Sequence, residues 1–210
     1  MDKFTTLTAR ACPLGHENID TDQLIPARFM SRPRAAGYSG FLMHDLRFTA
    51  DGASRDFILD QPAYAGARVL VTRRNFGTGS SREAAVYALW DFGIRCIIAP
   101  SFGDIFASNA VKNGLLPAQV SEATAEALLV AVLGSAAPPV TIDLETRAIS
   151  CASIKAEFAI DPVRRLQLIN GWDDLDLTLQ HVDVIGRFCK HHHERHPWAV
   201  ASTRVAPEHQ

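Results

Sequence analysis

Four consecutive residues, Ser80, Ser81, Arg82 and Glu83, bring together the side chains of this sequence that are best suited to chemistry. They follow a turn at residues 75–79, NFGTG, whose glycines let a ligand approach the backbone closely. An arginine in the first turn of a helix opposes the helix dipole, so its presence there favours a bound anion. Backbone N–H groups, hydroxyls and a guanidinium together indicate a site for an anion such as a carboxylate.

The same residues also allow a purely structural interpretation. Ser-x-x-Glu is a capping box, in which Ser80 would cap a helix and Glu83 would reach back to it. Helix caps are much commoner than nucleophiles or bases. Arg73 and Arg74 favour the anion site, because they add two cations at the end of the preceding strand.

The elements around these residues predict a strand, a loop and a helix. Residues 68–72 form a short β-branched apolar run that is typical of a buried strand. After the glycines, apolar residues recur at helical spacing at Ala84, Ala85, Ala88, Leu89 and Phe92. In α/β proteins, the loop between such a strand and its helix is a common place for a ligand.

The rest of the chain predicts an α/β fold. Strands expected at residues 94–99 and 115–120 are separated by a helix, which indicates parallel strands joined by crossovers. Antiparallel strands are expected at residues 140–144, 148–152 and 154–160. We also expect one entry strand at residues 4–11, a helix that starts at Pro162, and a last helix at residues 175–190.

Composition restricts the function classes. The chain has 210 residues, 47% of them hydrophobic, and a net charge of −2, which gives no electrostatic case for nucleic acid or for a membrane surface. Its four cysteines are scattered without a CxxC pair, so we expect reduced thiols, a cytoplasmic protein and no metal site in this chain. We expect one domain at residues 1–190, followed by a polar tail at 191–210 whose histidines are solvated.

Five short motifs occur along the chain, at residues 18–26 (NIDTDQLIP), 75–83 (NFGTGSSRE), 99–106 (APSFGDIF), 113–117 (NGLLP) and 177–181 (LTLQH). Together they resemble the swivelling domain of the aconitase superfamily. Their order and spacing are similar to those of the bacterial small subunits of 3-isopropylmalate dehydratase, over residues 4–188. The resemblance implies a swivelling β/β/α domain, with a central, mostly parallel sheet flanked by helices and with additional antiparallel strands.

The resemblance implies a hydro-lyase that is active only with a large subunit. The reaction isomerises 2-isopropylmalate to 3-isopropylmalate by dehydration and rehydration, a step of leucine biosynthesis. It needs a base, a cationic holder for a carboxylate and a Lewis acid. In the family the Lewis acid is a [4Fe–4S] cluster in the large subunit, so we expect no cofactor to be bound by this chain itself.

The resemblance also implies roles for individual residues. Ser80 would be the base, Arg82 would hold a substrate carboxylate, and Asp22 would be an active-site carboxylate near residues 75–82, the serine loop. Ser81 and the amide of Gly79 would supply further hydrogen-bond donors. For Asp22 and its neighbour Asp20, the alternative is that the carboxylates only bond nearby backbone N–H groups in a turn.

The loop at residues 27–40 follows residues 18–26, the aspartate motif, and in the family it reaches over the substrate. Arg34 or Arg32 of this loop could meet a substrate carboxylate, and a solvated surface position is the alternative for each.

The sequence departs from the family at positions near the proposed base. Thr78 stands where cysteine is usual, and Ala84 stands where histidine is usual. These differences leave two further hypotheses. The chain could be the small subunit of a related enzyme for a smaller alkylmalate, 2-methylmalate or 2,3-dimethylmalate. It could also be a non-catalytic anion-binding module, in which Ser80 is only a cap.

Overall fold

The computed structural model describes residues 1–134 and 136–199. Contacts within the chain form one compact unit, Met1–Trp172, and a second unit that begins at Asp173. The domain boundary expected at residue 190 falls inside a helix of the second unit, α8 (Val182–Arg195). The part of the expected tail at residues 200–210 lies outside the described residues.

The centre of the first unit is a parallel sheet of four strands in the order β2-β3-β4-β5. Its parallel strands separated by helices confirm the predicted α/β class. Pro13 and Pro117 lie in the two edge strands, where a missing N–H costs no hydrogen bond between neighbouring strands. The strands are β2 (Ala11–Leu14), β3 (Val69–Thr72), β4 (Cys96–Ala99) and β5 (Leu116–Gln119).

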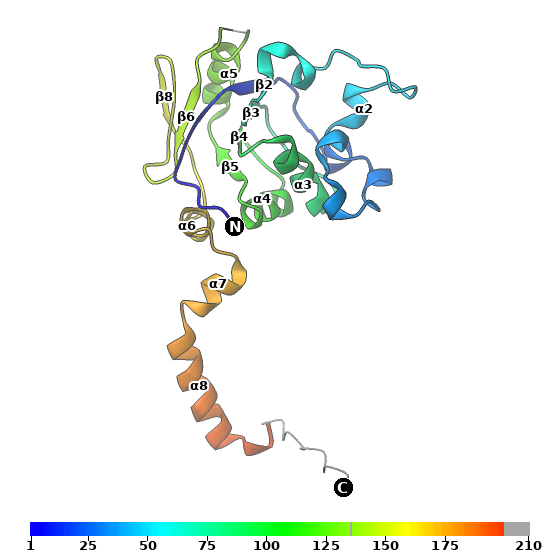
Figure 1. Ribbon diagram of the computed structural model, residues 1–210. Coiled ribbons are helices and arrows are strands. Elements are labelled where there is room, and N and C mark those ends of the chain that lie inside the picture. The colour runs from blue at the N-terminus through cyan, green and yellow to red at the C-terminus, as the bar shows by residue number, and fades with distance from the viewer. Residues whose placement is uncertain (135, 200–210) are drawn as a thin grey trace. The chain divides into compact units, whose positions relative to one another are not determined.

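Both faces of this sheet are covered, as Figure 1 shows. Leu70 and Ile97 point to a core that they share with α3 (Glu83–Phe92) and α4 (Asp104–Lys112). Their neighbours along the same strands belong to a second core, which includes α5 (Glu122–Ala131). Burial on both faces explains why the strands are continuously apolar in sequence.

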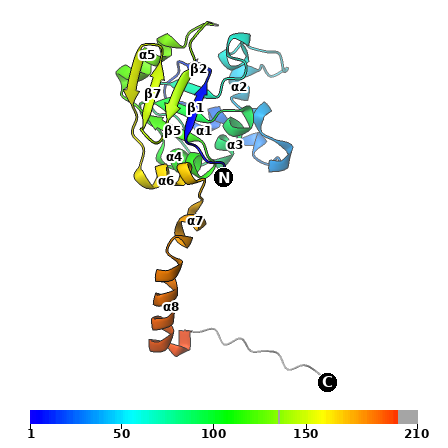
Figure 2. The ribbon, with the colours of Figure 1, turned by 60° about the vertical axis from the view of Figure 1, so that its left-hand side comes forward.

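A second sheet of four antiparallel strands packs against the second core, in the order β1-β6-β7-β8. The view of Figure 2 brings β1 and β7 of this sheet forward. Its three later strands confirm the predicted antiparallel segments. The strands are β1 (Thr6–Ala9), β6 (Val140–Asp143), β7 (Ala148–Cys151) and β8 (Ile154–Glu157).

The entry strand predicted at residues 4–11 is wrong as a single strand. It divides at Arg10, so that β1 joins the antiparallel sheet and β2 begins the parallel one. The backbone carbonyl of Arg10 accepts from the N–H groups of Arg68 and Val69, and its side chain donates to the carbonyl of Ala63 at 3.0 Å. The division results from pairing with strands that are distant in sequence. The local pattern of apolar residues therefore does not predict it.

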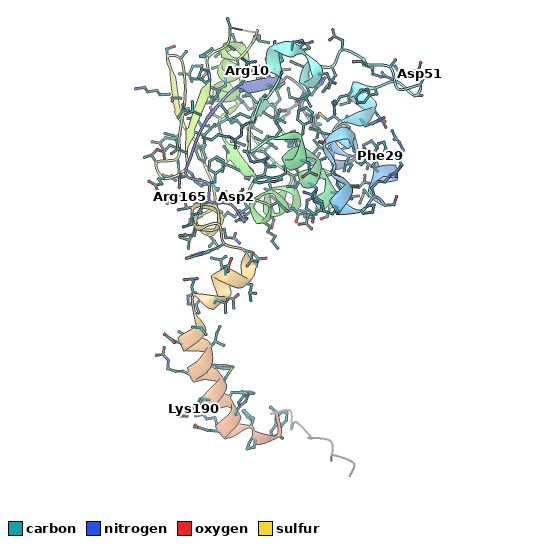
Figure 3. All side chains as sticks on the ribbon, in the orientation of Figure 1. Asp2, Arg10, Phe29, Asp51, Arg165 and Lys190 are labelled. Carbon is teal, nitrogen blue, oxygen red and sulfur yellow. The ribbon has the colours of Figure 1, made fainter. Side chains whose placement is uncertain are left out.

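Short elements complete the first unit. The segment at residues 27–40 forms 3₁₀ turns, with Phe29 on the same side of the unit as α2 (His44–Arg47) (Figure 3). Helix α6 (Pro162–Asn170) starts at Pro162 as predicted, behind the cap Asp161, and Gly171 ends it with a φ of 72°.

The second unit is helical. The single helix predicted at residues 175–190 is wrong, because α7 (Asp174–Leu179) ends before α8 begins. At the break, the side-chain amide of Gln180 donates to the carbonyl of Asp176 at 3.0 Å and satisfies an acceptor at the end of α7. Across the described residues, no helix combines the length and apolar character needed to cross a membrane.

Candidate active site

Three loops meet at the carboxyl ends of β2, β3 and β4. The loop after β3 contains the serine motif, and isolated bridges join it to both neighbours, through Asp20 with Thr78 and through Phe76 with Phe102. This edge is the usual ligand-binding edge of an open parallel sheet. The fold therefore brings together three motifs that are far apart in sequence.

Hydrogen bonds fix the serine loop against the aspartate motif. The N–H of Gly77 donates to the carbonyl of Ile19 at 2.7 Å, and the N–H of Thr21 donates to the carbonyl of Thr78 at 2.9 Å. The hydroxyl of Thr21, a buried residue, donates to the backbone carbonyl of Ser80 at 2.7 Å. The backbone that carries Ser80 is therefore held from outside its own loop.

Glycines allow this close approach. A Cβ atom on Gly77 would lie 2.2 Å from Cγ of Phe106, and the φ of Gly77 is +73°. A Cβ atom on Gly103 would lie 2.5 Å from the carbonyl oxygen of Gly77. Both positions therefore exclude any side chain.

A pocket of about 220 Å³ opens beside Ser80. Gly79, Ser80 and Ser81 lie exposed at its wall, and no described acceptor takes a hydrogen bond from the backbone N–H of any of the three. These donors are available to a ligand oxygen. The remaining lining residues are Thr21, Gly77, Arg82, Asp104, Ile105 and Phe106.

The guanidinium of Arg82 lines the same pocket and forms an ion pair with Asp22. The Arg82 side chain is only 15% exposed, whereas that of Asp22 is 57% exposed. Asp22 sits in α1 (Thr21–Leu24), which Asp20 caps by accepting from the N–H of Gln23 at 2.7 Å. Asp20 thus has the structural role that its turn chemistry suggested, while Asp22 pairs with the arginine.

The capping-box interpretation of Ser80 is wrong. Helix α3 begins at Glu83, its N-cap position is occupied by Arg82 in an extended conformation, and no side chain caps it. Glu83 instead accepts from the side-chain amide of Asn113 at 2.9 Å. The hydroxyl of Thr21 binds the carbonyl of Ser80, and the helix does not start directly after Ser80, as the capping box predicted, but at Glu83.

The sequence pattern did not assign two contributors to the pocket. The first is Thr21, whose hydroxyl reaches the serine loop. The second is the first turn of α4, with Asp104, Ile105 and Phe106, which brings a second helix N-terminus to the pocket. The motif APSFGDIF predicts a helix start at this turn. Only the order of the strands in the sheet shows that the turn lies beside the serine loop.

Arg73 and Arg74 do not add their charges to the pocket. Arg73 pairs with Glu126 at 2.6 Å, and Arg74 pairs with Glu17 at 2.7 Å. Both arginines line a separate hollow together with these glutamates. The expectation that they would reinforce the anion site is therefore wrong, and Arg82 is the arginine that lines the pocket.

Arg34 and Arg32 of the segment at residues 27–40 do not line the pocket. The guanidinium of Arg34 donates to both carboxylate oxygens of Asp91, at 2.5 and 2.7 Å, and lies 4.6 Å from the ring centre of Tyr87. The hydrogen bonds to Asp91 raise the pKa of Arg34. Arg32 is exposed, and its carbonyl accepts from the hydroxyl of Tyr38 at 2.7 Å.

The cysteines are dispersed in the structure as in the sequence. Cys12, Cys96 and Cys151 are buried, and Cys189 is partly exposed in the second unit. Within residues 1–134 and 136–199, no three His, Cys, Asp or Glu side chains are grouped to hold a metal ion. The thiols of this chain do not fit the ligand set of an iron–sulfur cluster, which needs several cysteines close together.

Comparisons with known proteins agree with this architecture. The family described as "Aconitase C-terminal domain" matches residues 1–123, which include all three loops of the site. A solved structure of 3-isopropylmalate dehydratase from Methanocaldococcus jannaschii is similar in fold, with a TM-score of 0.63 at 23% sequence identity. The similarity covers 87% of this chain and 98% of that one.

Relatives of higher identity extend over nearly the whole chain. A 3-isopropylmalate dehydratase small subunit from Rhodospirillum centenum is 45% identical over 202 residues, covering 95% of this chain and 100% of that protein. A protein of the same description from Acidothermus cellulolyticus is 46% identical over 188 residues, covering 90% and 93%. Because relatives with this description are about 45% identical over 90% or more of its length, this chain belongs to the family of 3-isopropylmalate dehydratase small subunits.

Proposed function

We propose that this chain is the small subunit of a hydro-lyase that converts 2-isopropylmalate to 3-isopropylmalate by removing water and adding it back. Relatives that match 90% or more of the chain carry this description. The single observation that carries the proposal is that Ser80 and Arg82 line one pocket, with Asp22 paired to the arginine. The arrangement suits a dicarboxylate substrate whose C–H bond must lose a proton.

In this proposal Ser80 is the base. A serine hydroxyl ionises far above neutral pH, so its alkoxide requires nearby positive charge and hydrogen-bond donors. The free N–H groups of Gly79, Ser80 and Ser81 supply such donors, and Arg82 supplies the charge. Arg82 also binds a substrate carboxylate and stabilises the negative charge that develops on it as the neighbouring carbon loses its proton.

The site needs a second subunit. Ser80 and Ser81 are exposed, and water at an open site weakens every charge interaction in it. A large subunit that closes over the pocket would exclude this water. The resemblance to the family implies that this subunit would also supply the Lewis acid that assists loss of hydroxide, as a [4Fe–4S] cluster.

The test is Ser80→Ala, assayed with the large subunit, with Ser153→Ala as control because Ser153 is an exposed serine at the turn before β8. Loss of turnover by about 10³-fold or more, with an unchanged melting temperature, is expected for removal of a base. Near-normal turnover would reject Ser80 as the base.

A substrate panel tests the alkyl group independently. We expect 2-isopropylmalate to give a higher kcat/KM than 2-methylmalate or 2,3-dimethylmalate. The reverse order would assign the chain to the related enzyme for smaller alkylmalates, and it would leave the roles of Ser80 and Arg82 intact.

A further inference from the structure

Two arginines stand side by side at the end of the parallel sheet opposite to the serine loop. Arg68 immediately precedes β3, and Arg95 immediately precedes β4. The N–H of Arg95 donates to the carbonyl of Arg68 at 2.8 Å, so the two residues are direct neighbours across the strands. Like charges in this relation repel each other, which destabilises the fold unless something offsets it.

The guanidinium of Arg95 is held in place. It lies 3.5 Å from the ring centre of Trp90, and its Nη1 donates to the carbonyls of Trp90 and Ile94, each at 2.8 Å. Partial burial, and secondly the charge of Arg68, lower the pKa of Arg95. The fold therefore fixes a cation in a position where its charge is disfavoured.

No described carboxylate neutralises this pair. Six other arginines of the same unit each contact a carboxylate, whereas no Asp or Glu oxygen among the described residues lies within 4.0 Å of a charged nitrogen of Lys3, Arg68 or Arg95. Asp2 and Asp91 act on Arg95 only from beyond ion-pair distance. Arg68 and Arg95 therefore lie side by side without an ion pair to offset their charges.

These residues surround a pocket of about 260 Å³. Its wall carries three cations, Lys3, Arg68 and Arg95, and one carboxylate, Asp2, which leaves two uncompensated positive charges. Figure 3 labels Asp2 beside the N-terminal end of the chain. The volume fits a molecule of a few heavy atoms, below the usual size of a drug site.

We propose that this pocket is a second binding site, separate from the serine loop, for a small anion that carries two negative charges. A phosphate group and a dicarboxylate share this chemistry. The planar guanidinium of Arg95 offers its remaining N–H groups to two oxygens of the ligand, and Arg68 and Lys3 supply the rest of the charge. Trp90 forms the floor against which Arg95 is stacked.

The experiment is a titration of the full chain with inorganic phosphate and, separately, with malonate, at constant ionic strength, followed by calorimetry and by tryptophan fluorescence. We expect saturable binding with a Kd below about 10 mM. Tighter binding of phosphate would identify a phosphorylated ligand, and tighter binding of malonate would identify a dicarboxylate.

Variants assign the binding to this pocket. Arg68→Gln, at an exposed position, should weaken the binding by about 10-fold through loss of one charged contact. Lys155→Gln removes an equal charge from an exposed position of β8 and should leave it unchanged. Any part of the binding that Arg82→Gln removes belongs to the proposed active site, and the part that only Arg68→Gln weakens belongs to this pocket.

Two results would overturn the proposal. One is the absence of saturable binding up to about 10 mM of either anion. The other is an affinity that Arg82→Gln abolishes and Arg68→Gln does not change, since the anion would then occupy the serine pocket. Neither result bears on the role of Ser80 as base.

Discussion

The hydroxyl of Thr21 donates a hydrogen bond to the backbone carbonyl of Ser80 at 2.7 Å, across 59 positions of sequence. It is a contact between the aspartate motif and the serine motif, and it holds the main chain that carries the proposed base. Thr21 lines the pocket and acts through the position of Ser80.

Thr21→Val should lower kcat by about 10- to 100-fold with little change in KM, because a small displacement of a catalytic group is costly. Loss of one hydrogen bond should cost only about 1 kcal/mol of folding stability. Thr21→Ser should restore most of the turnover, because it keeps the hydroxyl. Steady-state kinetics in the presence of the large subunit measure kcat and KM of each variant. Equal kcat values for the Val and Ser variants would contradict a role for the Thr21 hydroxyl in positioning Ser80.

The ion pair between Arg82 and Asp22 gives a second prediction. Asp22→Ala should reduce kcat/KM by about 10- to 100-fold, because Arg82 loses the partner that orients its guanidinium. Stability should hardly change, since the Asp22 side chain is 57% exposed and exposed pairs contribute little. Asp45→Ala, which breaks the exposed pair with Arg28, is the matched control and should leave kcat/KM intact.

Gly77 and Gly52 form a matched pair for the close packing of the loop. Both have positive φ, +73° and +84°, but a Cβ atom would meet Phe106 at Gly77 and nothing within 4 Å at Gly52. Gly52→Ala should cost about 1 kcal/mol, and Gly77→Ala several times more, because strain and overlap add. Urea unfolding of the two variants measures the difference, and similar midpoints would argue against the close approach.

Arg34 tests whether the segment at residues 27–40 reaches substrate. Its guanidinium is bound by Asp91, which also accepts from the N–H of Tyr38 at 2.8 Å. Asp91→Ala should speed tryptic cleavage after Arg34, since it removes the partner that fixes the segment. If Arg34 also binds substrate, Asp91→Ala should lower KM, and Arg34→Ala should raise it. Unchanged KM values in both variants would remove Arg34 from the substrate site.

The buried thiols predict a loss of stability at high pH. Burial raises the pKa of Cys12 to about 12 and also raises the pKa of Cys96, so both remain protonated in the folded state at pH 10. An unfolded thiol ionises near pH 9 and then binds fewer protons than the folded one. The free energy of unfolding should therefore fall between pH 8 and pH 10, by about 1.4 kcal/mol for each thiol.

Urea unfolding at pH 8 and pH 10 measures this loss, and the double variant Cys12→Ala and Cys96→Ala should show a smaller one. Cys189 provides an internal comparison, because it is partly exposed. Iodoacetamide at pH 8 should modify Cys189 in the native protein and leave Cys12 and Cys96 unmodified. Rapid labelling of either buried thiol would contradict the burial.

Local patterns predicted the central strands, the helices between them and the place of the serine loop. They failed where distant contacts decide the outcome. The start of α3 depends on the bond from Thr21 to Ser80, and the partners of Arg73 and Arg34 are glutamate and aspartate residues more than 50 positions away. A sequence shows which side chains carry charge, whereas only the fold shows which charges are already neutralised.

The division of the N-terminal segment at Arg10 has a consequence for folding during synthesis. Among the described strands, β1 pairs only with β6, in which Ile142 is the partner of Leu7. This pairing cannot form until residue 142 has left the ribosome. Strand β2, a few residues later, needs only β3, which emerges far earlier. The growing chain can therefore form the sheet beneath the serine loop first, and it completes its second layer only when most of the protein has been made.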